Sequence, residues 1–169
     1  LPRIAVMPAS KLKLEMTWDT VGLKGTGSHD LVVDNIEVSE DWTFVRGVAS
    51  PLPEPFFKYP SLSFATQVLT VVGIGVAAAA LEEFKALAPG KASITGGSEI
   101  ANRPVTQYEF AQAEAEFQAA RSWFYQTMDN AWQAILNGEK PSPEQISNMR
   151  LSCTHAARTS AEVARKIQM

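Results

Sequence analysis

The stretch SLSFATQVLTVVGIGVAAAALEEFKALA, residues 61–88, decides the fold class of this chain. Its apolar side chains recur at helical spacing, which predicts a long helix with one face in a core. Gly73 and Gly75 are poor helix formers, each costing about 1 kcal/mol relative to alanine, so we attribute them to close packing against another helix. The helix is expected to end before Pro89 and Gly90. The predicted core-facing residues are Phe64, Val68, Leu69, Val72, Val76, Ala79 and Ala80.

Two more long helices follow along the chain. One is predicted to open at Pro104, which suits a first helical turn, and to end at Asn137 and Gly138. The next begins with a capping box formed by Ser142 and Gln145. Three antiparallel helices would form an up-and-down bundle with much apolar surface left bare, so a fourth helix or a partner subunit is expected. The predicted core residues are Phe110, Phe117, Ala120, Phe124, Met128 and Ile135 in the first of these helices, and Ile146, Met149, Cys153, Ala156, Val163 and Ile167 in the second.

The residues before the helices have a different pattern. Short runs rich in β-branched or alternating residues predict strands at 3–7, 12–16, 30–38 and 42–45. Residues 47–60 contain four prolines, a density at which no regular element is expected. We therefore predict an α+β chain with a β part at residues 1–46, a proline-rich linker at 47–60 and a helical domain at 61–169.

Composition narrows the class of protein. A net charge of -3 argues against a nucleic-acid partner, which would require a basic face. The single cysteine, Cys153, fits a reducing cytoplasm. No signal peptide is visible, and the most apolar run, residues 68–81, is about 14 residues long and too short to span a bilayer. Because the chain begins with Leu1 and ends inside a helix pattern, we expect it to be part of a longer protein.

A glycine-rich stretch, GLKGTGSHD at residues 22–30, raises the question of a phosphate-binding loop. It matches neither the P-loop pattern nor the dinucleotide fingerprint, and it runs into a predicted strand rather than a helix. We predict a tight turn between strands, with Gly25 or Gly27 at positive φ. Adjacent strand residues point to opposite faces, so Ser28, His29 and Asp30 are not expected to converge as a catalytic triad.

Other candidate residues are few. Arg103 stands at the positive end of a helix, where a guanidinium makes a good anion site, although a solvated arginine is the alternative. Trp18 is either a packing residue or one wall of a pocket for a flat ligand. His155 is interpreted as a surface or interface residue and Cys153 as core. The two histidines show no metal-ligand spacing, so no metal is predicted.

A family resemblance emerges from these residues. The segment WDTVGLKGTGSHDLVVDNIEV, residues 18–38, resembles the acyl-CoA dehydrogenase superfamily, and more closely the flavin-dependent monooxygenases of that fold, the oxygenase components of two-component aromatic hydroxylases. That family carries a proline after the strand, where this chain has Ser39. Residues 71–91 and 102–128 resemble the first two helices of its C-terminal domain.

The resemblance implies the end of an antiparallel β-barrel-like domain followed by an incomplete four-helix bundle. It implies oxygenation of an aromatic or polycyclic substrate by O₂ and reduced flavin, either FMN or FAD, in a cytoplasmic homotetramer with a separate flavin reductase and no nucleic-acid or membrane partner. One alternative is an acyl-CoA dehydrogenase that oxidises a thioester with FAD. The G-T-G-S string and Ser39 argue against this alternative without excluding it. The other is a catalytically incomplete oligomerisation module.

The resemblance also implies cofactor-binding residues. Arg103 matches an arginine that reaches across a subunit interface to the flavin phosphate. Trp18 matches a tryptophan near the edge of the flavin ring, and Thr26 and Ser28 lie near the cofactor or a subunit contact. By position, Phe56, Phe57 and Tyr59 border the substrate pocket. The catalytic residues of the family lie outside this chain.

Overall fold

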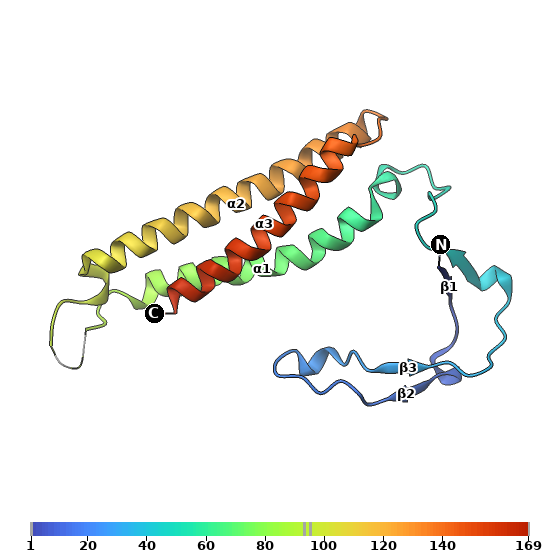
Figure 1. The fold of residues 1–169 in the computed structure, drawn as a ribbon, viewed down its shortest axis with the longest axis horizontal. Coiled ribbons are helices and arrows are strands. Elements are labelled where there is room, and N and C mark those ends of the chain that lie inside the picture. The colour runs from blue at the N-terminus through green and yellow to red at the C-terminus, as the bar shows by residue number, and fades with distance from the viewer. Residues whose placement is uncertain (1, 93, 95, 169) are drawn as a thin grey trace. The chain divides into compact units, whose positions relative to one another are not determined.

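The computed structural model describes residues 2–92, 94 and 96–168. The chain forms two compact units, residues 1–49 and 50–169. The first holds short strands and the second holds the long helices (Figure 1). This is the α+β class with a helical bundle that the sequence predicts.

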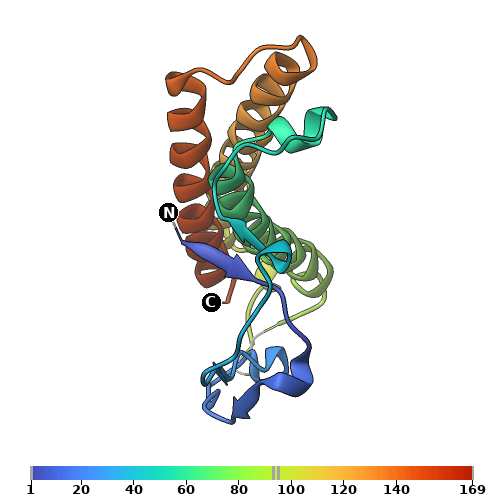
Figure 2. The ribbon, with the colours of Figure 1, turned by 90° about the vertical axis from the view of Figure 1, so that its right-hand side faces the viewer.

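The helical unit consists of α1 (Ser61–Leu87), α2 (Pro104–Leu136) and α3 (Pro143–Ile167). Helix α3 packs along both α1 and α2, whereas α1 and α2 barely touch each other. The helices alternate in direction, so α1 and α3 run the same way and α2 runs back between them in sequence (Figures 1 and 2). The up-and-down topology is therefore confirmed, with α3 as the helix shared by both packing seams.

The start of α3 follows the capping box predicted from the sequence. The Ser142 hydroxyl accepts a hydrogen bond from the Gln145 backbone at 3.1 Å, and the Gln145 side chain accepts one from the Ser142 backbone at 2.7 Å. The predicted faces of α2 and α3 also point inward, because their large apolar side chains repeat every three or four positions among polar ones. The buried members are Phe117, Ala120, Phe124, Ile135, Met149, Cys153, Ala156 and Val163, while Phe110, Met128 and Ile167 are partly buried against them.

The predicted core face of α1 is wrong. The buried side chains are those of Ser63, Thr70, Ile74, Ala77 and Leu81. Helix α1 is apolar on all sides, with a mean hydropathy of 1.9 in its most apolar window, so periodicity could not identify the inward face. The buried face combines the small Ser63, Thr70 and Ala77 with the larger Ile74 and Leu81, and small side chains let α3 approach closely. The predicted face is largely exposed, at 43% for Phe64, 46% for Val68, 77% for Leu69, 64% for Val72 and 57% for Val76, with Ala79 exposed and Ala80 half-buried.

The two glycines of α1 differ from each other. A Cβ atom added at Gly73 would lie 3.7 Å from the Cβ of Ser160 on α3, an ordinary van der Waals contact. A Cβ at Gly75 would meet no described atom within 4 Å. Close packing therefore accounts for Gly73 in part, and the same prediction for Gly75 is wrong within the described residues.

By length and composition, α1 could also cross a membrane. The sequence prediction that the apolar run is too short for this is wrong, because the helix continues on both sides of that run for 27 residues in all. A single helix of this kind is weak evidence for a membrane protein, since bundle helices of soluble proteins share the property. What the structure establishes is a wide apolar face on α1.

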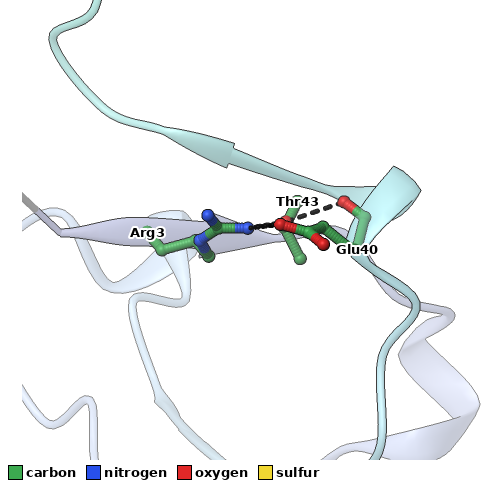
Figure 3. Close-up of polar contacts among 3 residues, drawn as sticks. All are labelled: Arg3, Glu40 and Thr43. Atoms are coloured by element: carbon green, nitrogen blue, oxygen red, sulfur yellow. Dashed lines mark hydrogen bonds and ion pairs between the residues drawn. The ribbon is translucent and has the colours of Figure 1, made fainter.

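The strand unit holds two antiparallel ladders. Strand β1 (Arg3–Ala5) pairs with β4 (Thr43–Val45), and β2 (Lys13–Glu15) pairs with β3 (Asp30–Val32). Figure 2 shows the two ladders as separate pieces. The Arg3 guanidinium ties β1 to the start of β4, because it donates to the Glu40 carboxylate at 3.1 Å and to the Thr43 hydroxyl at 2.8 Å (Figure 3).

Two expectations for this half of the chain need correction. The strand predicted for residues 30–38 ends at Val32, and three residues later Asn35 adopts a left-handed conformation, φ 53°, that a strand cannot accommodate. The proline-rich segment does contain a regular element, the single 3-10 turn η4 (Pro55–Lys58). Its proline stands at the first position, where the missing N–H is not needed.

Candidate functional site

The helical unit contains a pocket of about 840 Å³, which we call the aromatic pocket. Its walls come from η4, from the first two turns of α1 and from the last third of α2. A volume of this size is typical of small-molecule sites. The residues that line it are Phe56, Tyr59, Phe64, Gln67, Tyr125, Gln126, Met128, Asp129 and Trp132.

The rings of the aromatic pocket support one another. The Phe56 ring stands edge-on to the Phe64 ring, with centroids 5.7 Å apart, so η4 is anchored to α1. The Tyr59 and Trp132 rings are tilted, with centroids 6.3 Å apart, and connect the same segment to α2. Edge-on and tilted contacts of this kind are favoured by the ring quadrupoles. The walls are therefore fixed by packing before any ligand binds.

Tyr59 is the polar centre of this pocket. Its hydroxyl accepts a hydrogen bond from the Gln67 amide at 2.7 Å and faces the sulfurs of Met149 at 3.2 Å and Met128 at 3.5 Å. Burial raises the pKa of Tyr59 above its usual value, against the opposing effect of the Gln67 hydrogen bond. The raised pKa keeps the phenol neutral, and the hydrogen bond to its hydroxyl holds Gln67 in place beside it.

Arg103 lies at the N-terminal end of α2, in a loop that is held by its own hydrogen bonds. Its backbone occupies the cap position, and its Nε donates to the Ser98 carbonyl at 3.3 Å. The loop is pinned to the end of α1 through the Ala101 backbone, which donates to the Ala88 carbonyl at 3.3 Å. The Gln107 side chain donates to the Ala101 carbonyl at 3.0 Å. The guanidinium is therefore positioned beside the helix terminus.

This helix terminus fits a phosphate by its donor set. The first turn of α2 carries no acidic residue, so nothing there repels an anion. The backbone N–H groups of Val105 and Thr106 have no helical acceptor, and the helix dipole adds partial positive charge. The half-buried Arg103 supplies a full positive charge. The phosphate group of a flavin nucleotide suits these donors.

The glycine-rich loop joins β2 to β3 and is closed by local hydrogen bonds. The Trp18 indole N–H and the Thr26 hydroxyl both donate to the Leu23 carbonyl, at 3.1 and 2.8 Å. Gly27 has positive φ, as predicted for one of two glycines, but Gly22 and Leu23 do as well. The three-residue turn η2 (Lys24–Thr26) leads into a strand, so the loop offers no phosphate cradle at a helix terminus. It connects two strands, as predicted, but as a loop over residues 16–29 and not as a tight turn.

His29 has a structural role that sequence analysis missed. Its Nδ1 accepts a hydrogen bond from the Trp18 backbone at 3.0 Å, across the two arms of the hairpin. Thr17 makes a parallel bond, its hydroxyl accepting from the Asp30 backbone at 3.1 Å. Both bonds follow from the register of the hairpin, which pairs Glu15 with Asp30 and so brings residues 17–18 opposite residues 27–28. Ser28 is exposed, and among the described residues no group of three potential metal ligands is found.

Comparison with known proteins shows the family of the chain. Residues 67–168 match the family model described as acyl-CoA dehydrogenase, C-terminal domain. The chain belongs to this family. It is 78% identical over 169 residues, all of this chain and 43% of the relative, to an indole-3-acetate monooxygenase of Acinetobacter baumannii. It is 31% identical over 133 residues, 71% of this chain and 32% of the relative, to the oxygenase component of an FADH2-dependent resorcinol hydroxylase of Rhizobium sp..

The fold comparison agrees with the sequence comparison. The structure of XiaF from Streptomyces sp., in complex with FADH2 and glycerol, superposes with a TM-score of 0.87 at 19% identity, covering 98% of this chain and 44% of that chain. This chain therefore spans less than half the length of the relatives it matches. The predicted resemblance to this family, and within it to the flavin-dependent monooxygenases, is therefore confirmed.

Within this acyl-CoA dehydrogenase fold, the structure separates the predicted site residues. Trp18 and Thr26 meet at the Leu23 carbonyl, whereas Arg103 belongs to the helical unit. Phe56 and Tyr59 line the aromatic pocket, and Phe57 packs edge-on to Phe56 with centroids 5.7 Å apart. That these residues border the substrate stays a prediction. Sequence analysis missed the α2 side of this pocket, because it treated residues 125–132 only as helix interior.

Proposed function

We propose that the protein is the oxygenase component of a two-component flavin monooxygenase and that it hydroxylates indole-3-acetate or a close indole analogue. One observation carries this proposal: the 78% identity to the A. baumannii indole-3-acetate monooxygenase extends over every residue of the chain. An aromatic pocket of suitable size in the helical unit agrees with a flat aromatic substrate.

The cofactor of the proposed enzyme is reduced flavin, FMN or FAD. When bound, reduced flavin supplies the electrons that activate O₂. Arg103 and the first N–H groups of α2 would hold its phosphate, which both nucleotides share. Trp18, Thr26 and Ser28 are proposed to contribute to the flavin or subunit contact from the glycine-rich loop. The role of the rings around the aromatic pocket is to orient the substrate and exclude water.

The partners follow from the same proposal. A separate reductase would deliver the reduced flavin in the cytoplasm. The exposed apolar face of α1, defined by Phe64, Val68, Leu69 and Val72, supports assembly into a homotetramer, because exposed patches of this kind mark interfaces. The catalytic acid–base residues are proposed to lie outside this chain.

The activity is tested with the intact protein, chemically reduced flavin and O₂. We expect a hydroxylated product from indole-3-acetate by liquid chromatography and mass spectrometry. The same preparation is assayed with acyl-CoA and an artificial electron acceptor. Product only in the second assay would show an acyl-CoA dehydrogenase and overturn the proposal. Assembly without flavin binding would identify an oligomerisation module instead.

The phosphate contact is tested with Arg103→Met. Loss of a charge-assisted contact should weaken flavin binding about tenfold or more. Arg103→Lys should recover part of this loss, because it keeps the charge without the bidentate geometry. Arg158→Met, which removes an exposed arginine of α3, is the matched control. Equal flavin affinities for Arg103→Met and the control, measured by fluorescence quenching, would remove Arg103 from the site.

A further inference from the structure

One face of α2 carries two charged groups at the aromatic pocket. Arg121, Tyr125 and Asp129 are four residues apart and therefore lie on the same face of the helix. Tyr125 and Asp129 line the pocket. The guanidinium carbon of Arg121 lies 5.1 Å from the centroid of the Tyr125 ring, so this side chain extends over a wall of the pocket. A cation therefore stands beside the Tyr125 wall, just outside the lining, and a carboxylate lies within the lining one turn further along α2.

The hydrogen-bonding capacity of these groups is largely free among the described residues. Arg121 forms no ion pair or side-chain hydrogen bond there, so its guanidinium N–H groups have no protein acceptor among those residues. Asp129 receives one long contact, 3.5 Å from the Gln133 amide. The Gln67 side-chain N–H donates to the Tyr59 hydroxyl at 2.7 Å, and the Gln67 side-chain oxygen remains available as an acceptor among the described residues. Acceptors therefore gather inside the pocket and the cation stands at its edge.

The lining supplied by this chain disfavours the opposite orientation of a ligand. None of the residues that line the described pocket is Lys, Arg or His, so a carboxylate inside it would face Asp129 without a counter-charge. Asp129 lies two turns beyond Arg121, about 12 Å along the axis, and the Arg121 side chain covers part of that length by extending over Tyr125. About one turn, roughly 5–6 Å, remains for an aromatic ring.

We propose that the aromatic pocket binds the ring of an aromatic carboxylic acid, with its carboxylate on Arg121 and its ring N–H directed at Asp129. This assignment rests on the proposed function and names the residues that select its substrate. The aromatic walls select a flat ring by burying it, Arg121 selects the acid side arm, and Asp129 selects a ring with a hydrogen-bond donor over one without.

The test compares ligands that differ by one group. Calorimetry on the intact, flavin-free protein measures the affinity for indole-3-acetate, for the uncharged indole-3-acetamide, and for 1-methylindole-3-acetate, which lacks the ring N–H. Arg121→Met should weaken indole-3-acetate about tenfold and the acetamide less than about twofold. Asp129→Ala should weaken indole-3-acetate several-fold and leave the N-methyl analogue unchanged. Arg121→Lys should keep most of the affinity, because it keeps the charge.

Matched controls and a second readout make the outcome decisive. Arg158→Met and Glu83→Ala remove exposed charges of α3 and α1 away from the pocket, and they should leave all three affinities unchanged. Failure of the wild-type protein to bind, or equal effects of Arg121→Met and Arg158→Met, overturns the proposal. A change in the oligomeric mass of Arg121→Met with unchanged ligand affinity would show that Arg121 serves a contact between subunits. That outcome also overturns the proposal.

The proposed function is judged separately by hydroxylation of indole-3-acetate with the same variants. Normal turnover and KM in Arg121→Met would leave the activity standing and refute the pocket assignment. The predicted affinity pattern without any hydroxylation would support the pocket and refute the activity.

Discussion

Gly75 on α1 is the position at which sequence and structure make opposite predictions. A glycine in the middle of a helix indicates close packing by sequence, and replacing it would then insert a methyl group into a neighbour. In the structure, a Cβ at Gly75 meets no described atom within 4 Å. The Gly75→Ala substitution distinguishes the prediction from the sequence from the prediction from the structure.

The structure predicts that this substitution stabilises the helical unit. Alanine is favoured over glycine in a helix interior by about 1 kcal/mol, and no steric cost opposes the gain. Gly73→Ala is the companion variant, because its methyl group would lie 3.7 Å from the Ser160 Cβ, an ordinary contact that should preserve most of the same gain. One kcal/mol corresponds to a rise in Tm of about 3 °C for a chain of this size.

The assay is urea unfolding of the 169-residue chain followed by far-UV circular dichroism, with light scattering at each protein concentration. An increase in the free energy of unfolding for Gly75→Ala at unchanged association supports the reasoning. A decrease for Gly75→Ala, with Gly73→Ala neutral or stabilising, would refute it. That result would mean that another helix lies directly against Gly75 in the assembled protein.

Two further predictions concern the packing seams of the helical unit. Thr127 and Ser152 are buried between α2 and α3, with their hydroxyl oxygens 2.8 Å apart. Thr127→Val should therefore lower the free energy of unfolding by about 1 kcal/mol, and Ser152→Ala should cost less in that variant than in the wild type. A double-mutant cycle on unfolding free energies measures this coupling, and simple additivity would contradict it. The pKa of Glu114 is held below its usual 4.5 because Gln118 donates to it and Lys85 pairs with it, so its contribution to stability is present above pH 4.5 and is lost as pH falls through the lowered pKa. Glu114→Gln should therefore be less stable than wild type at neutral pH, with the difference shrinking in acid, as urea melts at several pH values will show.

The sequence predicted helix positions well because the signals for helix ends are local. The Ser142 capping box and Pro104 fix helix starts through a few adjacent residues, independent of the rest of the fold. The inward face of α1 depends instead on which surface α3 contacts, and a helix that is apolar all round leaves this undetermined. The strand at residues 30–32 was overestimated for a related reason, because β propensity continues past the point where Asn35 turns the backbone.

The candidate site was predictable only where one residue carries the signal. The position of Arg103 at the start of α2 was predictable because a charged residue before a helix-opening proline is visible in the sequence, and its role at the flavin phosphate stays a prediction. The α2 wall of the aromatic pocket was not, since Tyr125 and Trp132 follow the same helical pattern as core residues. Their exposure to a cavity depends on the position of η4, which is set by the contacts of Phe56 and Tyr59.

The length of α2 makes a final prediction about how the two candidate sites are combined. Arg103 caps the start of this uninterrupted helix, and Tyr125 in the aromatic pocket lies about 33 Å further along it. The phosphate of a flavin is joined to its ring by a short ribityl chain that cannot span this distance. A flavin held by Arg103 therefore cannot place its ring at the aromatic pocket of the same protomer. If both sites serve one reaction, they belong to different protomers.

Subunit complementation tests this directly. Arg103→Met and Arg121→Met proteins, each with reduced activity, are mixed, dissociated and reassembled. In a shared site, each hybrid pair holds one site with both arginines intact and one with neither. Random pairing should restore about one quarter of the wild-type sites, whereas the two proteins mixed without dissociation should restore none. Absence of recovery, with hybrid formation verified by tagged subunits, would show that Arg103 and the aromatic pocket do not form a composite site between protomers.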